Sequence, residues 1–282
     1  MINCVWYNGS FGNWDNGLLA EIFDSRPDVF IQHNTKNNPV FERAIVCLVG
    51  KPDVKEVREY LDKIDEAFVF LLSDEDGFFR WQDAIPERHT IYTQYFTELG
   101  KSEIKNRILL GAPNRIKDYK IDTTQPKKYL WSFVGQIQNT FRQDMLDVIK
   151  NWPDGYLQIC DSFGGYGNGG MDYVDYLNIM AQSRFVLSPS GSMSTDAFRT
   201  YECMEMGAIP IVNTRCQRDN EGFNYWQAVY PSNSLMQIEK WNDYHVSLYF
   251  MGVNHSAAEH NKWWFKYKQE LTDKLIAIAH GS

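Results

Sequence analysis

Short apolar runs alternate with amphipathic segments along most of the chain. This alternation is typical of α/β proteins, in which buried parallel strands are joined by helices. In the first half, residues 54–64 carry apolar side chains at helical spacing, between two of the apolar runs. The runs that predict strands are INCVWY (2–7), VFIQ (29–32), AIVCLV (44–49), AFVFLL (67–72) and RILL (107–110). The first half is therefore predicted to form one doubly wound lobe.

The segment 111–128 is polar, contains two prolines and shows no sustained period, so it is the predicted linker, with the boundary near Gln125. Beyond it the alternation restarts and predicts a second doubly wound lobe over 126–256. Its elements are strands at 129–135, 156–160, 184–188 and 208–212, and helices at 139–150, 172–182 and about 195–206. Residues 257–282 are predicted to form a helix that packs back across the lobes. The predicted domains are thus 1–125, 126–256 and 257–282.

Composition narrows the functional classes. The chain has 282 residues, of which 44% are hydrophobic, and this allows a large buried core. A net charge of −8 argues against nucleic acid as a partner. Five scattered cysteines and six histidines show no metal-ligand spacing, so no metal site is predicted. The sequence contains no leader-like start and no apolar run long enough to cross a bilayer, which predicts a soluble cytoplasmic protein without membrane insertion.

The most informative window is residues 183–212, where a strand leads through a loop of small residues into a helix and then into another strand. The loop SPSGSMS places hydroxyl residues and a glycine just before a helix N-terminus, where free amides and the helix dipole attract a diphosphate. On that helix, Arg199 and Glu202 share one face. A guanidinium can hold phosphate while the carboxylate accepts hydrogen bonds from ribose hydroxyls.

The alternative for Arg199 and Glu202 is an ordinary intrahelical ion pair. The context favours a nucleotide site, because Gly207 can end the helix and Pro210 follows it. This order places the window at the carboxyl edge of a parallel sheet, where open α/β folds bind ligands. The glycine-rich segment 161–170 matches no phosphate-binding spacing and is predicted to be a mobile loop that can close over a bound nucleotide.

Residues 183–212 resemble the donor lobe of exostosin-like glycosyltransferases (glycosyltransferase family 47). That family carries a strand of the type SRFCLxPxG, a serine-containing loop, an Arg-x-x-Glu helix and a G-x-I-P-V strand. A second resemblance is YLWSFVGQIQNTFRQDM, in which Arg142 takes the place of the family's arginine. The first half resembles the family only in the order of its elements. The chain looks like the short soluble forms found in large algal viruses.

The resemblance implies a GT-B fold, with two Rossmann-like lobes and a cleft between them. It implies an inverting, metal-independent transfer of a sugar from a UDP-sugar to a glycan or glycoprotein acceptor. Xylose is the first candidate for the sugar. No cofactor is implied besides the nucleotide sugar itself. The donor-binding residues that it suggests are Arg142, Ser188, Ser190, Gly191, Ser192, Ser194, Arg199 and Glu202.

An inverting transfer needs a base, which is expected from the first lobe. The family's Asp-His pair is replaced here by SDEDGFF, in which Asp76 is the first candidate and Asp74 the second. Phe78 and Phe79 are expected to desolvate Asp76 and raise its pKa. Three readings stay open beside this one. The acidic residues form a solvated turn, or Asp74 and Asp76 hold a metal in a GT-A glycosyltransferase, or the chain is a non-catalytic sugar-binding protein.

Overall fold

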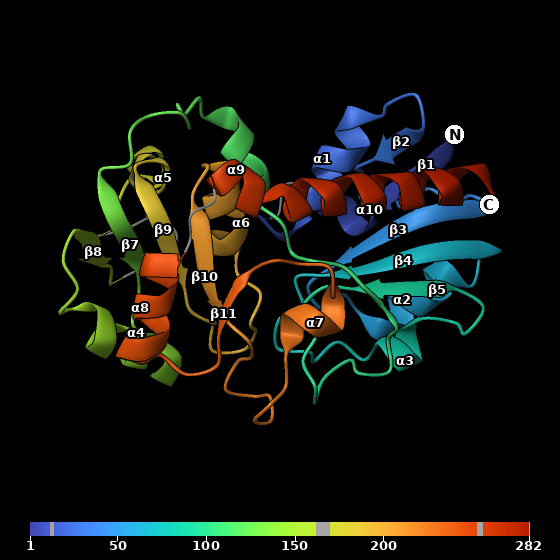
Figure 1. Cartoon of the computed structure of the whole chain (residues 1–282). Helices are drawn as coiled ribbons and strands as arrows, with labels where there is room; N and C mark the ends of the chain where they lie inside the picture. Colours follow the sequence, from blue (N-terminus) through green and yellow to red (C-terminus); the bar gives the residue numbers. More distant parts are fainter. Residues whose placement is uncertain (12–13, 162–169, 253–255, 282) are drawn as a thin grey trace. The chain divides into compact units, whose positions relative to one another are not determined.

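The computed structural model describes residues 1–11, 14–161, 170–252 and 256–281 (Figure 1). The chain divides into two compact units. Unit 1 comprises Met1–Arg115 and Tyr267–Ser282, and unit 2 comprises Ile116–Lys266. The sequence instead placed the first boundary near Gln125 and set residues 257–282 apart. Each unit is an α/β structure built on a parallel sheet, as predicted. Within the described ranges, no helix combines the length and apolar character that crossing a membrane requires.

Unit 1 contains a parallel sheet whose strand order is β2-β1-β3-β4-β5-β6. The strands are β1 (Ile2–Trp6), β2 (Phe30–His33), β3 (Arg43–Val49), β4 (Glu66–Leu72), β5 (Thr90–Thr93) and β6 (Asn106–Arg107). The helices of this unit are α1 (Gly17–Ser25), α2 (Val54–Leu61), α3 (Trp81–Ala84) and most of α10 (Lys262–His280). The central strands β3 and β4 are continuous apolar runs because both of their faces are covered.

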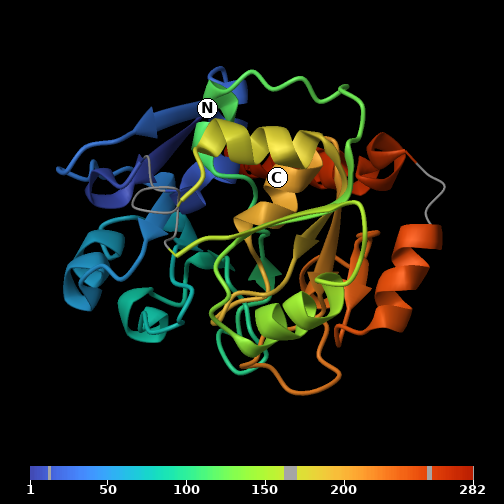
Figure 2. The ribbon, with the colours of Figure 1, turned by 90° about the vertical axis from the view of Figure 1, so that its left-hand side faces the viewer.

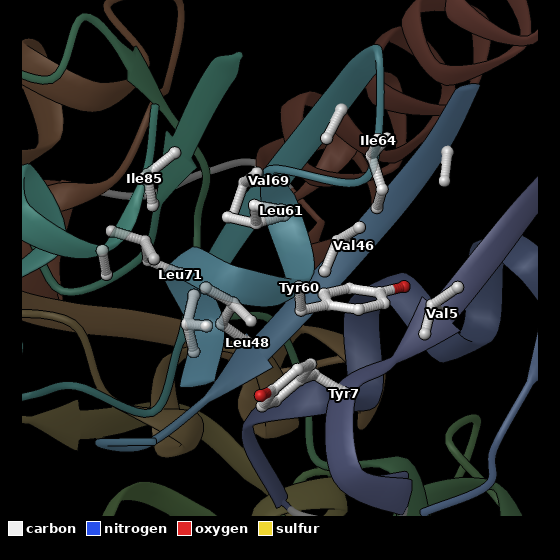
Figure 3. Packing of buried hydrophobic residues seen from close by; sticks show 14 of the residues in the cluster. Val5, Tyr7, Val46, Leu48, Tyr60, Leu61, Ile64, Val69, Leu71 and Ile85 are labelled. Atoms are coloured by element: carbon white, nitrogen blue, oxygen red, sulfur yellow. The ribbon is translucent and has the colours of Figure 1, made fainter. Parts of the chain in front are cut away.

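One face of this sheet packs against α2 and α3, and Figure 3 shows the side chains that meet there. Val46 of β3 and Val69 of β4 point to this face and meet Leu61. The other face packs against α1 and α10. Trp6 of β1 meets Phe23 of α1 with ring centroids 5.9 Å apart. Alternating side chains along each strand therefore fill two separate apolar layers.

Unit 2 contains a second parallel sheet, in the order β11-β10-β9-β7-β8. Its strands are β7 (Tyr129–Gly135), β8 (Gly155–Ile159), β9 (Ser183–Ser188), β10 (Ile209–Asn213) and β11 (Met236–Ile238). Its helices are α4 (Thr140–Ile149), α5 (Tyr173–Ala181), α6 (Phe198–Glu205), α7 (Tyr225–Val229), α8 (Asp243–Gly252) and α9 (Ala257–His260). Phe185 and Leu187 of β9 pack with α4 and α8, whereas Val186 packs with α5 and α6. Figure 2 shows α5 (yellow) and α4 (lime) on either side of these strands.

Several elements differ from their predicted bounds. The helix expected from about Thr195 begins at Phe198, because the preceding residues form a tight loop in which Ser194 Oγ accepts the amide of Asp196 at 3.0 Å. The helix expected over 257–282 is split into α9 and α10 at Asn261, whose side-chain amide donates to the Ala208 carbonyl at 2.7 Å. Most of the glycine-rich segment 161–170 lies outside the described residues.

Candidate functional site

Three loops of unit 2 meet at the carboxyl edge of its sheet. They follow β7, β9 and β10, which are parallel neighbours and therefore end on the same edge. Ser190 joins all three loops. Its carbonyl accepts the side-chain amide of Asn139 at 2.9 Å, its amide donates to Asn213 Oδ1 at 3.1 Å, and its hydroxyl donates to the Arg215 carbonyl at 2.8 Å. The loop that the sequence selected is thus the centre of this edge.

The predicted serines of this loop divide into two groups. Ser188, Ser190 and Ser194 are buried, and the hydroxyl of Ser188 lies 2.9 Å from that of Thr200 on α6. These side chains hold the loop to its surroundings. Gly191 and Ser192 are partly exposed and form the part of the loop that a ligand can approach.

Arg199 lies in the first turn of α6, where Ala197, at the N-cap position, has no polar side chain to cap the helix. Its Nη2 donates to the Val134 carbonyl at 2.8 Å, and its guanidinium lies 4.7 Å from the centroid of the Phe133 ring. Close contact with β7 requires a glycine, because a Cβ on Gly135 would lie 2.4 Å from Nη2. Among the described residues, no hydrogen-bond partner reaches the buried Nε. The guanidinium is therefore fixed against the strand end, with its Nε donor unused.

Glu202 is one turn further along α6 and is only 4% exposed. Its carboxylate accepts the hydroxyls of Tyr173 at 2.6 Å and Tyr176 at 2.9 Å, both from α5. Burial, together with the nearby Glu202 charge, raises the pKa of Tyr176 well above its ordinary value, so this tyrosine stays a donor. These two hydroxyls hold the carboxylate in place.

Sequence reasoning missed these two tyrosines. The signal was present, because Tyr173 and Tyr176 are three residues apart in a segment predicted to be helical, and so share one face. What the sequence alone could not give is that this face turns toward α6.

Arg142 reaches the same edge from α4. Asn139 caps that helix by accepting the Arg142 amide at 2.9 Å, and Arg142 Nη1 donates to the Gln136 carbonyl at 3.0 Å. Arg142 and Arg199 therefore contact the backbone on both sides of Gly135. The structure brings together the predicted donor-site residues of β7, β9 and their following helices.

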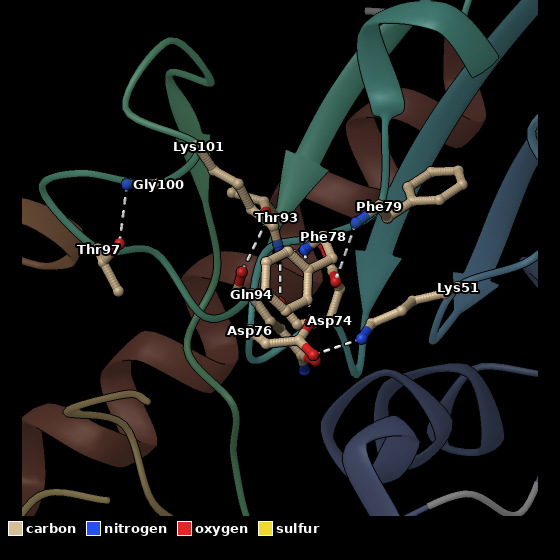
Figure 4. Close-up of polar contacts among 10 residues, drawn as sticks. All are labelled: Lys51, Asp74, Asp76, Phe78, Phe79, Thr93, Gln94, Thr97, Gly100 and Lys101. Atoms are coloured by element: carbon tan, nitrogen blue, oxygen red, sulfur yellow. Dashed lines mark hydrogen bonds and ion pairs between the residues drawn. The ribbon is translucent and has the colours of Figure 1, made fainter. Parts of the chain in front are cut away.

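The two predicted catalytic carboxylates lie in unit 1, in the turn after β4 (Figure 4). Asp74 is 1% exposed and forms an ion pair with the buried Lys101, with Nζ and Oδ2 3.0 Å apart. Lys101 Nζ also donates to the Asp74 carbonyl at 2.8 Å, and Asp74 Oδ1 accepts the Phe79 amide at 3.3 Å. These contacts give Asp74 a structural role in shaping the turn.

Asp76 pairs with Lys51, which follows β3, and Asp76 Oδ1 accepts the Phe78 amide at 3.4 Å (Figure 4). Burial by itself would raise the pKa of Asp76, but the hydrogen bonds from Lys51 and from the Phe78 amide, with the Lys51 charge, lower it below its ordinary value. The expected rise in pKa was therefore wrong. Phe79 is buried but Phe78 is 68% exposed and lies beside Lys51, so it does not desolvate Asp76 as predicted.

A carboxyl group that the sequence did not single out lies nearby in unit 1. Asp15 is 8% exposed and accepts the Tyr95 hydroxyl at 2.8 Å. Burial raises the pKa of Asp15, and hydrogen bonds from Ser73 and Tyr95 offset this only in part. Both of these partners have left-handed backbone, with φ of 59° at Ser73 and 50° at Tyr95. Such conformations are uncommon outside glycine and are found where surrounding structure imposes them.

The two lysines also bear on the metal-binding alternative. Each carboxylate of the Asp-x-Asp motif, Asp74 and Asp76, contacts an ammonium group, whose charge opposes a divalent cation. Across the described part of the chain, no group of three or more His, Cys, Asp or Glu side chains is arranged to hold a metal ion.

Comparison with known protein families identifies the family to which the chain belongs. The family model of the RXYLT1 C-terminal domain matches residues 113–282, which include all of the donor-edge residues described above but not Asp15, Asp74 or Asp76. This is a xylosyltransferase-related, exostosin-like family, so the resemblance to exostosin-like glycosyltransferases is supported in its general form. A search of curated proteins finds no match. The match covers more than half of the sequence, and the chain belongs to the RXYLT1 C-terminal domain family.

Proposed function

We propose that this protein is an inverting, metal-independent glycosyltransferase that transfers a sugar from a UDP-sugar to a glycan or glycoprotein acceptor. Xylose is the first candidate for the sugar because the family is related to xylosyltransferases. The observation that carries the proposal is that α6 presents both Arg199, held by the Val134 carbonyl, and a buried Glu202, held by two tyrosine hydroxyls. These two residues lie at the carboxyl edge of a parallel sheet, where α/β folds bind nucleotides.

In this proposal the two halves of the nucleotide meet different groups. The Glu202 carboxylate accepts hydrogen bonds from the ribose hydroxyls. Arg199 and Arg142 donate to the diphosphate, aided by the amides of the Gly191–Ser192 part of the loop and by the N-terminus of α6. These donors are in place before the ligand arrives, since Arg199 and Arg142 are already held by backbone carbonyls.

The same donors would promote the chemistry. The acceptor oxygen forms a bond to the anomeric carbon while the bond from that carbon to the diphosphate breaks, and the electron pair leaves with UDP. Arginines fixed around the departing diphosphate stabilise its growing charge. A carboxylate takes the proton of the acceptor hydroxyl. Asp76 remains the first candidate, because Asp74 is buried against Lys101.

Calorimetry with UDP tests the donor site. We expect wild type to bind UDP, and Arg199→Ala and Glu202→Ala each to weaken binding by about tenfold to 100-fold, since each loses a charge-assisted contact. Arg142→Ala should act in the same direction. Arg26→Ala is a matched control, because that exposed arginine pairs with Asp28 in unit 1. Unchanged affinity in both the Arg199 and the Glu202 variants would remove the donor-site assignment.

Hydrolysis of the donor in the absence of acceptor separates an enzyme from a sugar-binding protein that lacks the chemistry. We expect slow release of UDP from a UDP-sugar by wild type, and a much smaller rate in Arg199→Ala at saturating donor. Tight donor binding with no release of UDP, with or without a panel of glycan acceptors, would favour the non-catalytic reading.

A further inference from the structure

Arg215 lies in the loop after β10 and is joined to the donor edge through its backbone. Its carbonyl accepts the Ser190 hydroxyl at 2.8 Å, so the loops after β9 and β10 are fastened to each other at this residue. Nothing in its local sequence, NTRCQRDN, marks it as a ligand-binding residue. Its position depends on the pairing of β10 with β9, in which Val212 lies beside Ser188.

The Arg215 side chain is nearly buried, and its charge is only weakly balanced. It is 11% exposed and lies over the Phe141 ring, with the guanidinium carbon 5.5 Å from the ring centroid. Nη1 donates to the Asp219 carbonyl at 3.2 Å. Glu221 is 3.9 Å from Nη2 but is 75% exposed, and it also pairs with Lys240. Within the described ranges, no hydrogen-bond partner reaches the buried Nε.

Asp219, whose carbonyl accepts Arg215 Nη1, is buried, and its carboxylate bonds to Cys216. Asp219 Oδ2 accepts the Cys216 amide at 3.1 Å and lies 3.2 Å from the Cys216 sulfur. These bonds fix the turn from which Arg215 projects. Burying a guanidinium without a close buried counter-charge carries a free-energy cost. A bound anion would offset that cost.

Three guanidinium groups contact the segment 134–141. Arg199 donates to the Val134 carbonyl, Arg142 donates to the Gln136 carbonyl, and Arg215 lies over Phe141. We call Arg142, Arg199 and Arg215 the arginine cluster. Positive charge concentrated in this way, in a chain of net charge −8, is what a diphosphate requires.

We propose that Arg215 is the third diphosphate-binding arginine of the donor site. This inference rests on the proposed function. It adds that the arginine cluster contacts the phosphates from α4, from α6 and from the loop after β10, with Arg215 supplying Nε and Nη donors from the side of β10.

Calorimetry of wild type, Arg215→Gln and Arg215→Lys with UDP, uridine and pyrophosphate tests this. We expect Arg215→Gln to weaken UDP and pyrophosphate binding by about tenfold to 100-fold while leaving uridine binding unchanged. Arg215→Lys should recover only part of the loss, because an ammonium keeps the charge but lacks the planar fork. Arg184→Gln is the matched control. Arg184 also lies beside a phenylalanine, with its guanidinium carbon 5.3 Å from the Phe185 ring centroid, but near the opposite end of β9.

The outcomes are distinguishable. If wild type binds UDP and Arg215→Gln binds it equally well, the inference is wrong and the proposed function stands. If wild type binds pyrophosphate but not UDP, the arginine cluster remains an anion site and the nucleotide assignment fails. Equal losses for UDP and uridine in Arg215→Gln would mean that Arg215 only supports the fold. Thermal unfolding of each variant monitors that last effect, and Arg215→Lys keeps the test informative if Arg215→Gln is unfolded.

Discussion

Replacing Asp74 with asparagine tests whether this residue is a structural anchor. Its carboxylate and the Lys101 ammonium are 1% and 3% exposed and lie 3.0 Å apart. Removing one partner of such a pair leaves the other charge buried, at a cost of about 3–5 kcal/mol. For domains of about this size, a loss of about 1 kcal/mol lowers the melting temperature by roughly 2–4 °C. We therefore expect Asp74→Asn to melt roughly 10 °C below wild type.

The control is in the same turn. Asp76 pairs with Lys51, whose side chain is 47% exposed, and exposed pairs contribute only about 0–1 kcal/mol. Asp76→Asn should therefore melt within about 2 °C of wild type. The double variant Asp74→Leu/Lys101→Met removes both buried charges and should recover much of the lost stability. Thermal unfolding followed by circular dichroism measures all four proteins. If Asp74→Asn melts like wild type, the structural reading of this ion pair is refuted.

Three further outcomes follow from the site. Gly135→Ala should weaken UDP binding in calorimetry and lower the melting temperature, because the added Cβ would lie 2.4 Å from Arg199 Nη2. Gly252→Ala is the control and should change neither quantity, because no atom lies within 4 Å of its added Cβ. Burial raises the pKa of Asp15 in the folded state, so the folded state loses stability as pH rises from the ordinary Asp range through that raised pKa. Asp15→Asn should thus raise the melting temperature more at pH 7 than at pH 4, and equal changes at both would contradict the pKa direction. Transfer or donor hydrolysis should survive EDTA, and complete loss restored by Mn²⁺ would favour the Asp-x-Asp reading.

The elements that local pattern predicted best are the buried central strands. β3 and β4 are long continuous apolar runs, and both were expected within about two residues. β5 was missed because two of the four residues of TIYT are threonines, which interrupt the apolar run, and β11 because MQI has only three residues. Of the helices, α2 shows a clear polar face, whereas α1 is apolar on most sides and offers no helical stripe to read.

For the candidate site too, the sequence predicted what lies within one local element but not the contacts between elements. Arg199 and Glu202 were visible because they share one local helix. The partners of Glu202 come from α5, and Arg215 follows β10, so finding them requires knowing which elements become neighbours in space. Lys51 is an intermediate case. Once β3 and β4 are paired with Val49 beside Leu72, the loops after both strands start at the same level, and the Lys51–Asp76 contact could have been anticipated.

Arg199 combines a role in the fold with the proposed role in binding, and its geometry explains how both are compatible. A guanidinium has five N–H donors in a fixed plane. One of them serves the Val134 carbonyl and fixes the plane against β7, while the Phe133 ring supports one face. A diphosphate can bind the remaining Nε donor without breaking the contact that orients the guanidinium. Binding therefore costs little further side-chain entropy. A lysine at this position has three donors on one rotatable nitrogen, so a bond to the carbonyl would not fix the direction of the other two. Preorganisation at Arg199 therefore depends on Gly135, which alone lets the guanidinium lie this close to the end of β7.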